Sequence, residues 1–131
     1  MTTTDSVLEH NKKVTVAFYQ KALFEGDVDT ALELYAGETY TQHTPFAGDG
    51  KDGLRNYIKW IAQTCPNPKG EIKRVFADGD FVILHVHWTG LFGKNGDAVI
   101  DLFRLQDGKL VEHWDVIQAI PDTSLNNNTM F

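Results

Sequence analysis

The pattern of apolar residues changes near the middle of the chain, from helical spacing to alternation. In the first quarter, four apolar residues share one helical face: Val14, Ala17, Phe18 and Ala22. This spacing predicts a helix from about Asp5 to Glu25. Asp27 can cap a second, short helix, because its carboxylate can accept a hydrogen bond from a first-turn N–H. The apolar positions expected on one face of that helix are Ala31, Leu34 and Tyr35.

An extended segment around Tyr40 to His43 precedes a third predicted helix. The apolar residues of that helix stand at positions i, i+3, i+4 and i+7: Leu54, Tyr57, Ile58 and Ile61. Pro66 and Pro68 end it, because proline has no N–H to donate and its ring clashes with the preceding turn.

From Glu71 onward the hydrophobic period is two, which is typical of strands. Three turn signals divide this half into four strands: Asp78-Gly79, Asn95-Gly96 and Asp107-Gly108. Consecutive short connections favour an antiparallel meander. Because a sheet must bury one face, we expect an α+β fold, a cone-shaped barrel with three N-terminal helices packed on a curved, mainly antiparallel sheet.

With 131 residues, 42% of them hydrophobic, the chain suits one domain with a single core, spanning 1–131. The segment 122–131 lacks periodicity, and we expect a mobile tail there. Cys65 is the single cysteine, so an intramolecular disulfide is impossible and paired cysteine ligands for zinc are lacking. A reducing compartment is consistent with this.

The formal charge of −6 opposes binding to nucleic acid or to an anionic membrane. The amino-terminal residues do not combine a basic segment with an apolar run, and the chain lacks an apolar stretch near the roughly 20 residues of a membrane span. We therefore expect a cytoplasmic protein whose partners are a hydrophobic small molecule or another protein.

The hairpin from Asp101 to Asp115 concentrates acidic and imidazole groups. A type I turn followed by a glycine bulge would pair Leu105 with Lys109 and therefore Asp101 with His113. One sheet face would then carry a polar and aromatic set: Asp101, Phe103, Val111, His113 and Asp115. A two-residue type I′ turn would instead place Asp101 opposite Trp114 and move His113 to the other face.

One segment of this hairpin combines three short motifs: Phe103-Arg104, Asp107-Gly108-Lys109 and Glu112-His113-Trp114-Asp115. With the order helix, helix, strand, helix, it resembles the SnoaL-like polyketide cyclases of the nuclear-transport-factor-like superfamily, over Val7 to about Ile120. The resemblance implies a cone fold. It also implies that Asp115 is the acid/base of an intramolecular aldol closure, beside a matching His113. Asp101 stands where the family has another histidine.

Elementary chemistry supports an acid–base pocket formed by Asp115, Asp101 and His113. An apolar cavity disfavours a charged carboxylate and raises its pKa, and a second carboxylate strengthens the effect. A histidine can stabilise one of the two as its cationic partner. Such a site suits abstraction of a proton next to a carbonyl, which begins aldol-type cyclisation, isomerisation and dehydration. We expect no cofactor.

Other side chains are candidates for substrate binding: Gln42, His43, Tyr57, His85, His87 and Phe103. Only one of the alternating pairs around Gln42 and His43 can line the cavity. His85 and His87 share one face of their strand and lie either on the pocket wall, which we favour, or in solvent. The histidines and carboxylates also permit a metal site, although His-x-His alone is weak evidence and we expect none.

Two further functions are open from the sequence. Limonene-type epoxide hydrolysis in this fold needs an arginine between two aspartates, and the preferred register puts Arg104 on the opposite face. A non-catalytic module that binds a hydrophobic ligand or dimerises is the other alternative. We expect a homodimer through the outer sheet face, with apolar residues there: Leu102, Trp114, Val116 and, on one assignment of faces, Val82, Leu84 and Trp88.

Overall fold

The computed structural model describes residues 4–131, and in this range it confirms the predicted α+β class. Its α-helices are α1 (Asp5–Tyr19), α2 (Val28–Tyr35) and α3 (Gly50–Thr64). A π-helical turn, Gln20–Phe24, continues α1, so the first helical region ends close to the predicted Glu25. The Asp27 carboxylate accepts a hydrogen bond from the Thr30 N–H at 3.3 Å, which confirms the predicted cap of α2.

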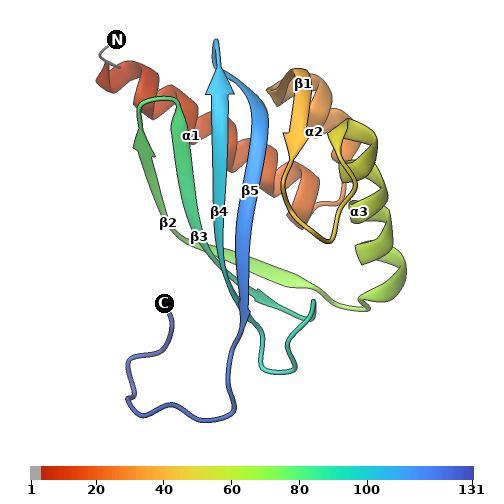
Figure 1. Ribbon diagram of the computed structural model, residues 1–131, viewed down its shortest axis with the longest axis vertical. Helices are drawn as coiled ribbons and strands as arrows, with labels where there is room; N and C mark the ends of the chain where they lie inside the picture. The colour runs from red at the N-terminus through yellow and green to blue at the C-terminus, as the bar shows by residue number, and fades with distance from the viewer. Residues whose placement is uncertain (1–3) are drawn as a thin grey trace.

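The described sheet has five strands: β1 (Ala36–Gln42), β2 (Lys69–Asp78), β3 (Phe81–Thr89), β4 (Asp97–Gln106) and β5 (Lys109–Ala119). Their order across the sheet is β1-β5-β4-β3-β2, and β2 to β5 form the predicted antiparallel meander (Figure 1). β1 pairs with β5 in parallel. The sequence predicts an extended segment there but not this pairing, which proves central to the site.

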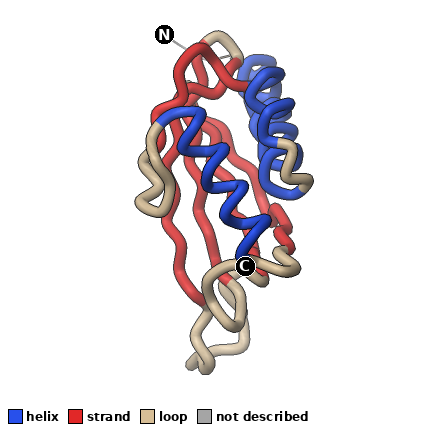
Figure 2. Tube along the Cα trace, turned by 90° about the vertical axis from the view of Figure 1, so that its right-hand side faces the viewer, coloured by secondary structure: helices blue, strands red, loops and turns tan. Residues whose placement is uncertain are grey.

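The helices cover one face of the curved sheet (Figure 2). Alternation along β3 sends four apolar side chains into the core, each at most 3% exposed: Val82, Leu84, Val86 and Trp88. Burial of each stabilises the fold by about 1.5–3 kcal/mol. The assignment of Val82, Leu84 and Trp88 to an outer apolar patch is therefore wrong, because this is the strand face that the helices need.

The β4–β5 hairpin differs in register from the preferred prediction. Asp107 and Gly108 both have positive φ, 52° and 76°, as a two-residue type I′ turn requires. Gln106 pairs with Lys109, and a bulge near Val111 then shifts the register so that Asp101 pairs with Asp115, not with His113. The turn and the bulge each move the register by one residue. Together they preserve the predicted shared face of Asp101, His113 and Asp115.

The segment after β5 folds back over the outer face of the sheet. The Phe131 ring lies 5.5 Å from the ring of His85 and 4.1 Å from that of His87, measured between centroids. The Lys73 ammonium lies 5.8 Å from the same ring. No helix within 4–131 combines the length and the apolar character needed to cross a membrane. The amino-terminal residues 1–3, part of the segment searched for a targeting signal, lie outside the described range.

Candidate functional site

A narrow pocket lies between the inner face of the sheet and helices α1 and α3. Its cavity volume is about 40 Å³, which is room for a few waters, since one water needs roughly 10–15 Å³. The polar residues that line it are Tyr19, Tyr40, Gln42, Thr44, Tyr57, Asp97, Asp101, His113 and Asp115. Phe18, Phe103, Leu54 and Val99 are among its apolar walls. Small polar groups can therefore enter a mostly apolar environment.

Three of the predicted site residues converge in this pocket from β4 and β5. Asp101 and Asp115 face each other across the two strands, and His113 precedes Asp115 by two positions on the same face. His113 Nε2 lies 2.8 Å from Asp101 Oδ1. Asp101 and His113 are buried, whereas Asp115 is half-buried. A proton can therefore pass between Asp101 and His113, which are almost out of contact with bulk water.

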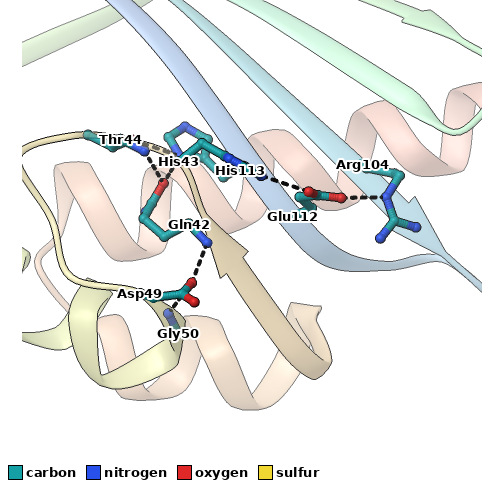
Figure 3. Close-up of polar contacts among 8 residues, drawn as sticks. All are labelled: Gln42, His43, Thr44, Asp49, Gly50, Arg104, Glu112 and His113. Carbon is teal, nitrogen blue, oxygen red and sulfur yellow. Dashed lines mark hydrogen bonds and ion pairs between the residues drawn. The ribbon is translucent and has the colours of Figure 1, made fainter.

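Gln42 determines the protonation of the second ring nitrogen of His113, Nδ1. The parallel pairing of β1 with β5 sets Gln42 beside His113, and Gln42 Oε1 lies 2.7 Å from His113 Nδ1 (Figure 3). The same oxygen accepts the Thr44 N–H at 3.1 Å, which identifies it as the carbonyl end of the amide. An amide carbonyl oxygen can only accept, so Nδ1 must carry a hydrogen. The single proton of the Nε2–Oδ1 contact is then shared between His113 and Asp101.

Asp115 has a raised pKa. Burial is the largest cause, and the negative charge of Asp101 is the second. His113 and the Thr44 hydroxyl oppose the shift. A carboxyl with a raised pKa exchanges its proton more readily near neutral pH than an exposed aspartate does, so the environment suits Asp115 for acid–base work.

One carboxylate oxygen of the pocket lacks a partner. Asp101 Oδ2 is buried, and no described residue forms a hydrogen bond with it. Buried polar atoms without partners are uncommon in folded proteins and call for an explanation, such as a bound ligand or water. This oxygen therefore marks a position where a bound molecule can place a hydrogen-bond donor.

Asp97, which was not among the residues predicted from the sequence, lines one side of the pocket. Its carboxylate is 1% exposed and accepts the N–H groups of Phe92 and Gly93 at 3.1 Å. Phe92 in turn packs against Phe46 and Trp60, with ring centroids 5.1 Å and 5.9 Å apart. In the sequence, the feature that could have pointed to this role of Asp97 is its position directly after the Asn95-Gly96 turn. Asp97 therefore anchors the aromatic rim of the pocket.

The predicted substrate-binding residues are divided between the two faces of the sheet. Gln42, Tyr57 and Phe103 line the pocket. His43 does not, because alternation along the chain turns it outward, where its Nε2 lies 2.7 Å from Glu112 and its ring stacks on Trp114 at 4.7 Å.

His85 and His87 also lie outside the pocket, and the expectation that they line its wall is wrong. They alternate with the core residues of β3 and therefore occupy the outer face, beside Phe131. Arg104 is on that face as predicted, with its Nε 2.8 Å from Glu112. The described part of the pocket thus has no arginine for an epoxide-hydrolase triad.

A divalent cation would need donor atoms from Asp101, His113 and Asp115, which lie within 4.8 Å of one another. In the observed arrangement, however, the His113 nitrogen that a cation would bind is engaged with Asp101. Gln42 occupies the other nitrogen. The arrangement fits proton sharing between His113 and Asp101 better than coordination of a metal.

Comparison with known proteins agrees with this architecture. The family described as the SnoaL-like domain matches residues 15–113. Comparison with curated proteins found no match.

Among solved structures, a candidate polyketide cyclase from Acidithiobacillus ferrooxidans is 21% identical, with a TM-score of 0.69 over 82% of this chain and 87% of that one. TsrD from Streptomyces laurentii is 20% identical, with a TM-score of 0.69 over 88% and 90% of the two chains.

A candidate SnoaL-like polyketide cyclase from Jannaschia sp. CCS1 is 14% identical, with a TM-score of 0.71 over 89% of this chain and 91% of that one. At these identities the likeness of the structures establishes the fold, a cone-shaped α+β barrel, and does not establish the reaction. The family match covers most of the chain, from α1 to the site histidine on β5. The chain therefore belongs to the SnoaL-like domain family.

Proposed function

We propose that this protein is a small-molecule enzyme that moves a proton next to a carbonyl group, with Asp115 as the acid/base. The observation that carries the proposal is the convergence of Asp115, Asp101 and His113 in an enclosed, mostly apolar pocket. The resemblance to SnoaL-like cyclases, whose acid/base aspartate lies on the last strand, supports the choice of Asp115.

In the proposed reaction, the Asp115 carboxylate removes a proton from the carbon next to a substrate carbonyl. The electrons of that C–H bond form the enolate, and Asp115 becomes a carboxylic acid. In an aldol closure, the enolate carbon attacks a second carbonyl of the same substrate and Asp115 protonates the resulting alkoxide. In an isomerisation, Asp115 returns the proton to a different carbon. Either path regenerates the carboxylate.

Asp101 and His113 have a different role in this proposal. They share one proton through the contact between Nε2 and Oδ1. The charge of Asp101 helps to raise the pKa of Asp115. The pair therefore tunes the base rather than acting as a second one.

The test is turnover by Asp115→Asn on a panel of β-dicarbonyl and polyketide-like compounds that the wild-type protein converts. The substitution keeps the shape of the side chain and removes its acid–base function. We expect turnover to fall by about 100-fold or more with substrate binding retained. Asp78→Asn, at an exposed position on β2, is the matched control.

Unchanged rates in Asp115→Asn would remove Asp115 from the mechanism. If no compound of the panel is converted but some bind, the alternative gains support, namely a non-catalytic module that binds hydrophobic ligands. In that case removal of Asp115 or Asp101 changes affinity alone.

We also propose that two copies pair through the outer face of β4 and β5. Ile100 and Val116 are paired neighbours on this face, and they are 43% and 71% exposed. Trp114 lies on the same face. Apolar side chains in such a cluster favour a partner over water. We expect the wild type to sediment as a dimer, and Trp114→Asp or Val116→Asp to shift it toward monomer. A wild-type monomer would contradict the proposal.

A further inference from the structure

A second cavity lies on the outer face of the sheet, where the segment after β5 folds back over β2 and β3. Its volume is about 860 Å³, within the range of roughly 300–1,000 Å³ that small-molecule sites occupy. Among the described residues, none lines both this cavity and the pocket that contains Asp115. The two cavities therefore lie on opposite faces of the sheet, and the outer one has no part in the proposed reaction.

The segment that covers the outer cavity is attached at both sides. Near its start, the Asn95 amide donates to the Ile120 carbonyl at 3.3 Å and to the Asp122 carboxylate at 2.7 Å. Farther along, the Phe131 ring stacks on His87 of β3 with the centroids 4.1 Å apart. Between these contacts the segment curls back from the end of β5 (Figure 1). The cavity therefore has a defined wall.

The lining of this cavity is cationic, although the whole chain has a formal charge of −6. Lys73 and Arg74 contribute positive charge, and none of the described lining side chains is acidic. The other polar lining residues carry amides, hydroxyls or an imidazole: Asn95, Asn126, Asn127, Ser124, Thr129 and His87. A local excess of positive charge attracts an anion.

A β-bulge brings the two cations to the same cavity. Neighbouring residues of a regular strand point to opposite faces of the sheet. Ile72 pairs with Val86 and Arg74 with His85, so Lys73 is the extra residue of β2. As a result, Lys73 and Arg74 both line the cavity. Bulges that redirect a side chain in this way are frequent next to functional sites.

Arg74 is the cation with the most donors left for a ligand. The chain has three arginines. Carboxylates engage the other two, Arg55 and Arg104. Within residues 4–131, Arg74 has no such ion pair, and its Nη1 donates to Nδ1 of His85 instead. A guanidinium has five N–H donors in a planar fork, so most of them remain for an anion.

Lys73 supplies a second charge that a ligand can share. Its ammonium lies 3.1 Å from the carboxylate of Glu71, which is 68% exposed, and 5.8 Å from the centroid of the Phe131 ring. An exposed ion pair contributes little to stability, so the ammonium can turn to a ligand at small cost. The cavity also has an apolar side, with Met130 beside Phe131, and these two side chains suit a flat ring.

We propose that the outer cavity binds a small aromatic phosphate ester. Arg74 and Lys73 hold the phosphate, and the ring packs against Met130 and Phe131. A phosphate group has three oxygens that accept hydrogen bonds, so it uses more of the donors in this lining than a carboxylate does. The site is independent of the proposed function, because its residues lie on the other face of the sheet.

Calorimetric titration with 1-naphthyl phosphate tests the proposal, and 1-naphthol provides the same ring without the charge. We expect the wild type to bind the ester about 10-fold or more tightly than the alcohol. Arg74→Gln should weaken binding of the ester by about 10-fold to 100-fold, as loss of hydrogen bonds to a charged group does. Arg55→Gln removes the same charge from α3 and is the matched control. It should bind as the wild type does.

Two further measurements locate the ligand. Phe131→Ala should weaken binding of 1-naphthyl phosphate and leave the weaker binding of inorganic phosphate unchanged, because it removes the ring and keeps both cations. The ester should shift the imidazole NMR signals of His87 and leave those of His113 in place. Asp115→Asn should bind the ester as the wild type does, which separates this site from the proposed reaction.

Several results would overturn the proposal. They are a wild-type protein that does not bind the ester, equal affinity for the ester and the alcohol, unchanged affinity in Arg74→Gln, and shifts at His113 in place of His87. Binding of 1-naphthoate as tight as that of 1-naphthyl phosphate would contradict the choice of a phosphate.

Discussion

Substitution of Gln42 by leucine tests whether β1 controls the protonation of the site histidine. Gln42 Oε1 accepts the His113 Nδ1–H at 2.7 Å and the Thr44 N–H at 3.1 Å. Leucine has a similar size but no acceptor. In Gln42→Leu, the Nδ1 atom of His113 keeps only the Thr44 hydroxyl, at 3.2 Å, and the Thr44 N–H loses its partner.

The size of the expected loss in stability follows from the burial of the groups that Gln42 contacts. His113 and Thr44 are 7% and 3% exposed, so water reaches neither donor freely. The Thr44 N–H, left without a partner, costs about 1–3 kcal/mol. The hydrogen bond that His113 Nδ1 loses costs about 1 kcal/mol more, and the apolar leucine offsets about the same amount. We expect a net loss of about 1–3 kcal/mol in the free energy of unfolding. For a domain of this size, that lowers Tm by roughly 4–12 °C.

Thermal unfolding followed by circular dichroism at neutral pH measures this loss. The ¹⁵N shifts of the imidazole report which ring nitrogen carries the hydrogen, and the Nδ1–H form should lose its dominance in the variant. Gln63→Leu, at an exposed position on α3, is the matched control and should leave both measurements unchanged. A Gln42→Leu protein that melts with the control and keeps the wild-type imidazole shifts would refute the assigned role of Gln42.

Three further substitutions probe the carboxylates. Asp101→Asn removes the second cause of the raised pKa of Asp115, so that pKa should fall, and the acid limb of the pH–rate profile should move to lower pH. Asp115→Asn should raise Tm at neutral pH, because a raised folded-state pKa means that the charged form opposes folding above that pKa. The gain in Tm should shrink as pH falls toward the ordinary value of 3.8, and a gain independent of pH would refute this linkage. Asp97→Ala strands the N–H groups of Phe92 and Gly93, so it should destabilise the fold by about 2–4 kcal/mol and speed hydrogen exchange across 90–96. Unchanged exchange in that loop would contradict the anchoring role of Asp97.

The order of the elements was predictable because it depends on local patterns. Spacing of 3, 4 and 7 residues predicted α3, and the capping carboxylate predicted the start of α2. Paired turn residues divided the second half into the observed meander. These signals act within a few residues of each other, so a single sequence contains them in full.

The register of the hairpin was not predictable in the same way. Asp107-Gly108 is compatible with both turn types considered, and the bulge at Val111 has no clear local signal. The shared face of Asp101 and His113 was nevertheless predicted, because two one-residue shifts add to a shift of two residues, which returns each side chain to the same face. The same limit applies to β3, where alternation separated the histidines from the aliphatic residues but did not say which set the helices would cover.

The contribution of β1 depends on contacts between distant parts of the chain. Gln42 meets His113 because β1 pairs in parallel with β5, far away in sequence. Tyr19 meets Trp88 because α1 packs across the sheet, as Figure 1 shows. Neither contact follows from residue spacing. Tyr19 was therefore not among the predicted site residues, and Gln42 was assigned to substrate binding instead of to the orientation of His113.

A ¹³C NMR titration of the Asp115 side-chain carboxyl tests the central claim most directly, with Asp115→Asn identifying the signal. We predict a midpoint above the ordinary aspartate value of 3.8, and a lower midpoint when Asp101 is replaced by asparagine. A midpoint at or below 3.8 in the wild-type protein would contradict the claim that the pocket prepares Asp115 for proton transfer.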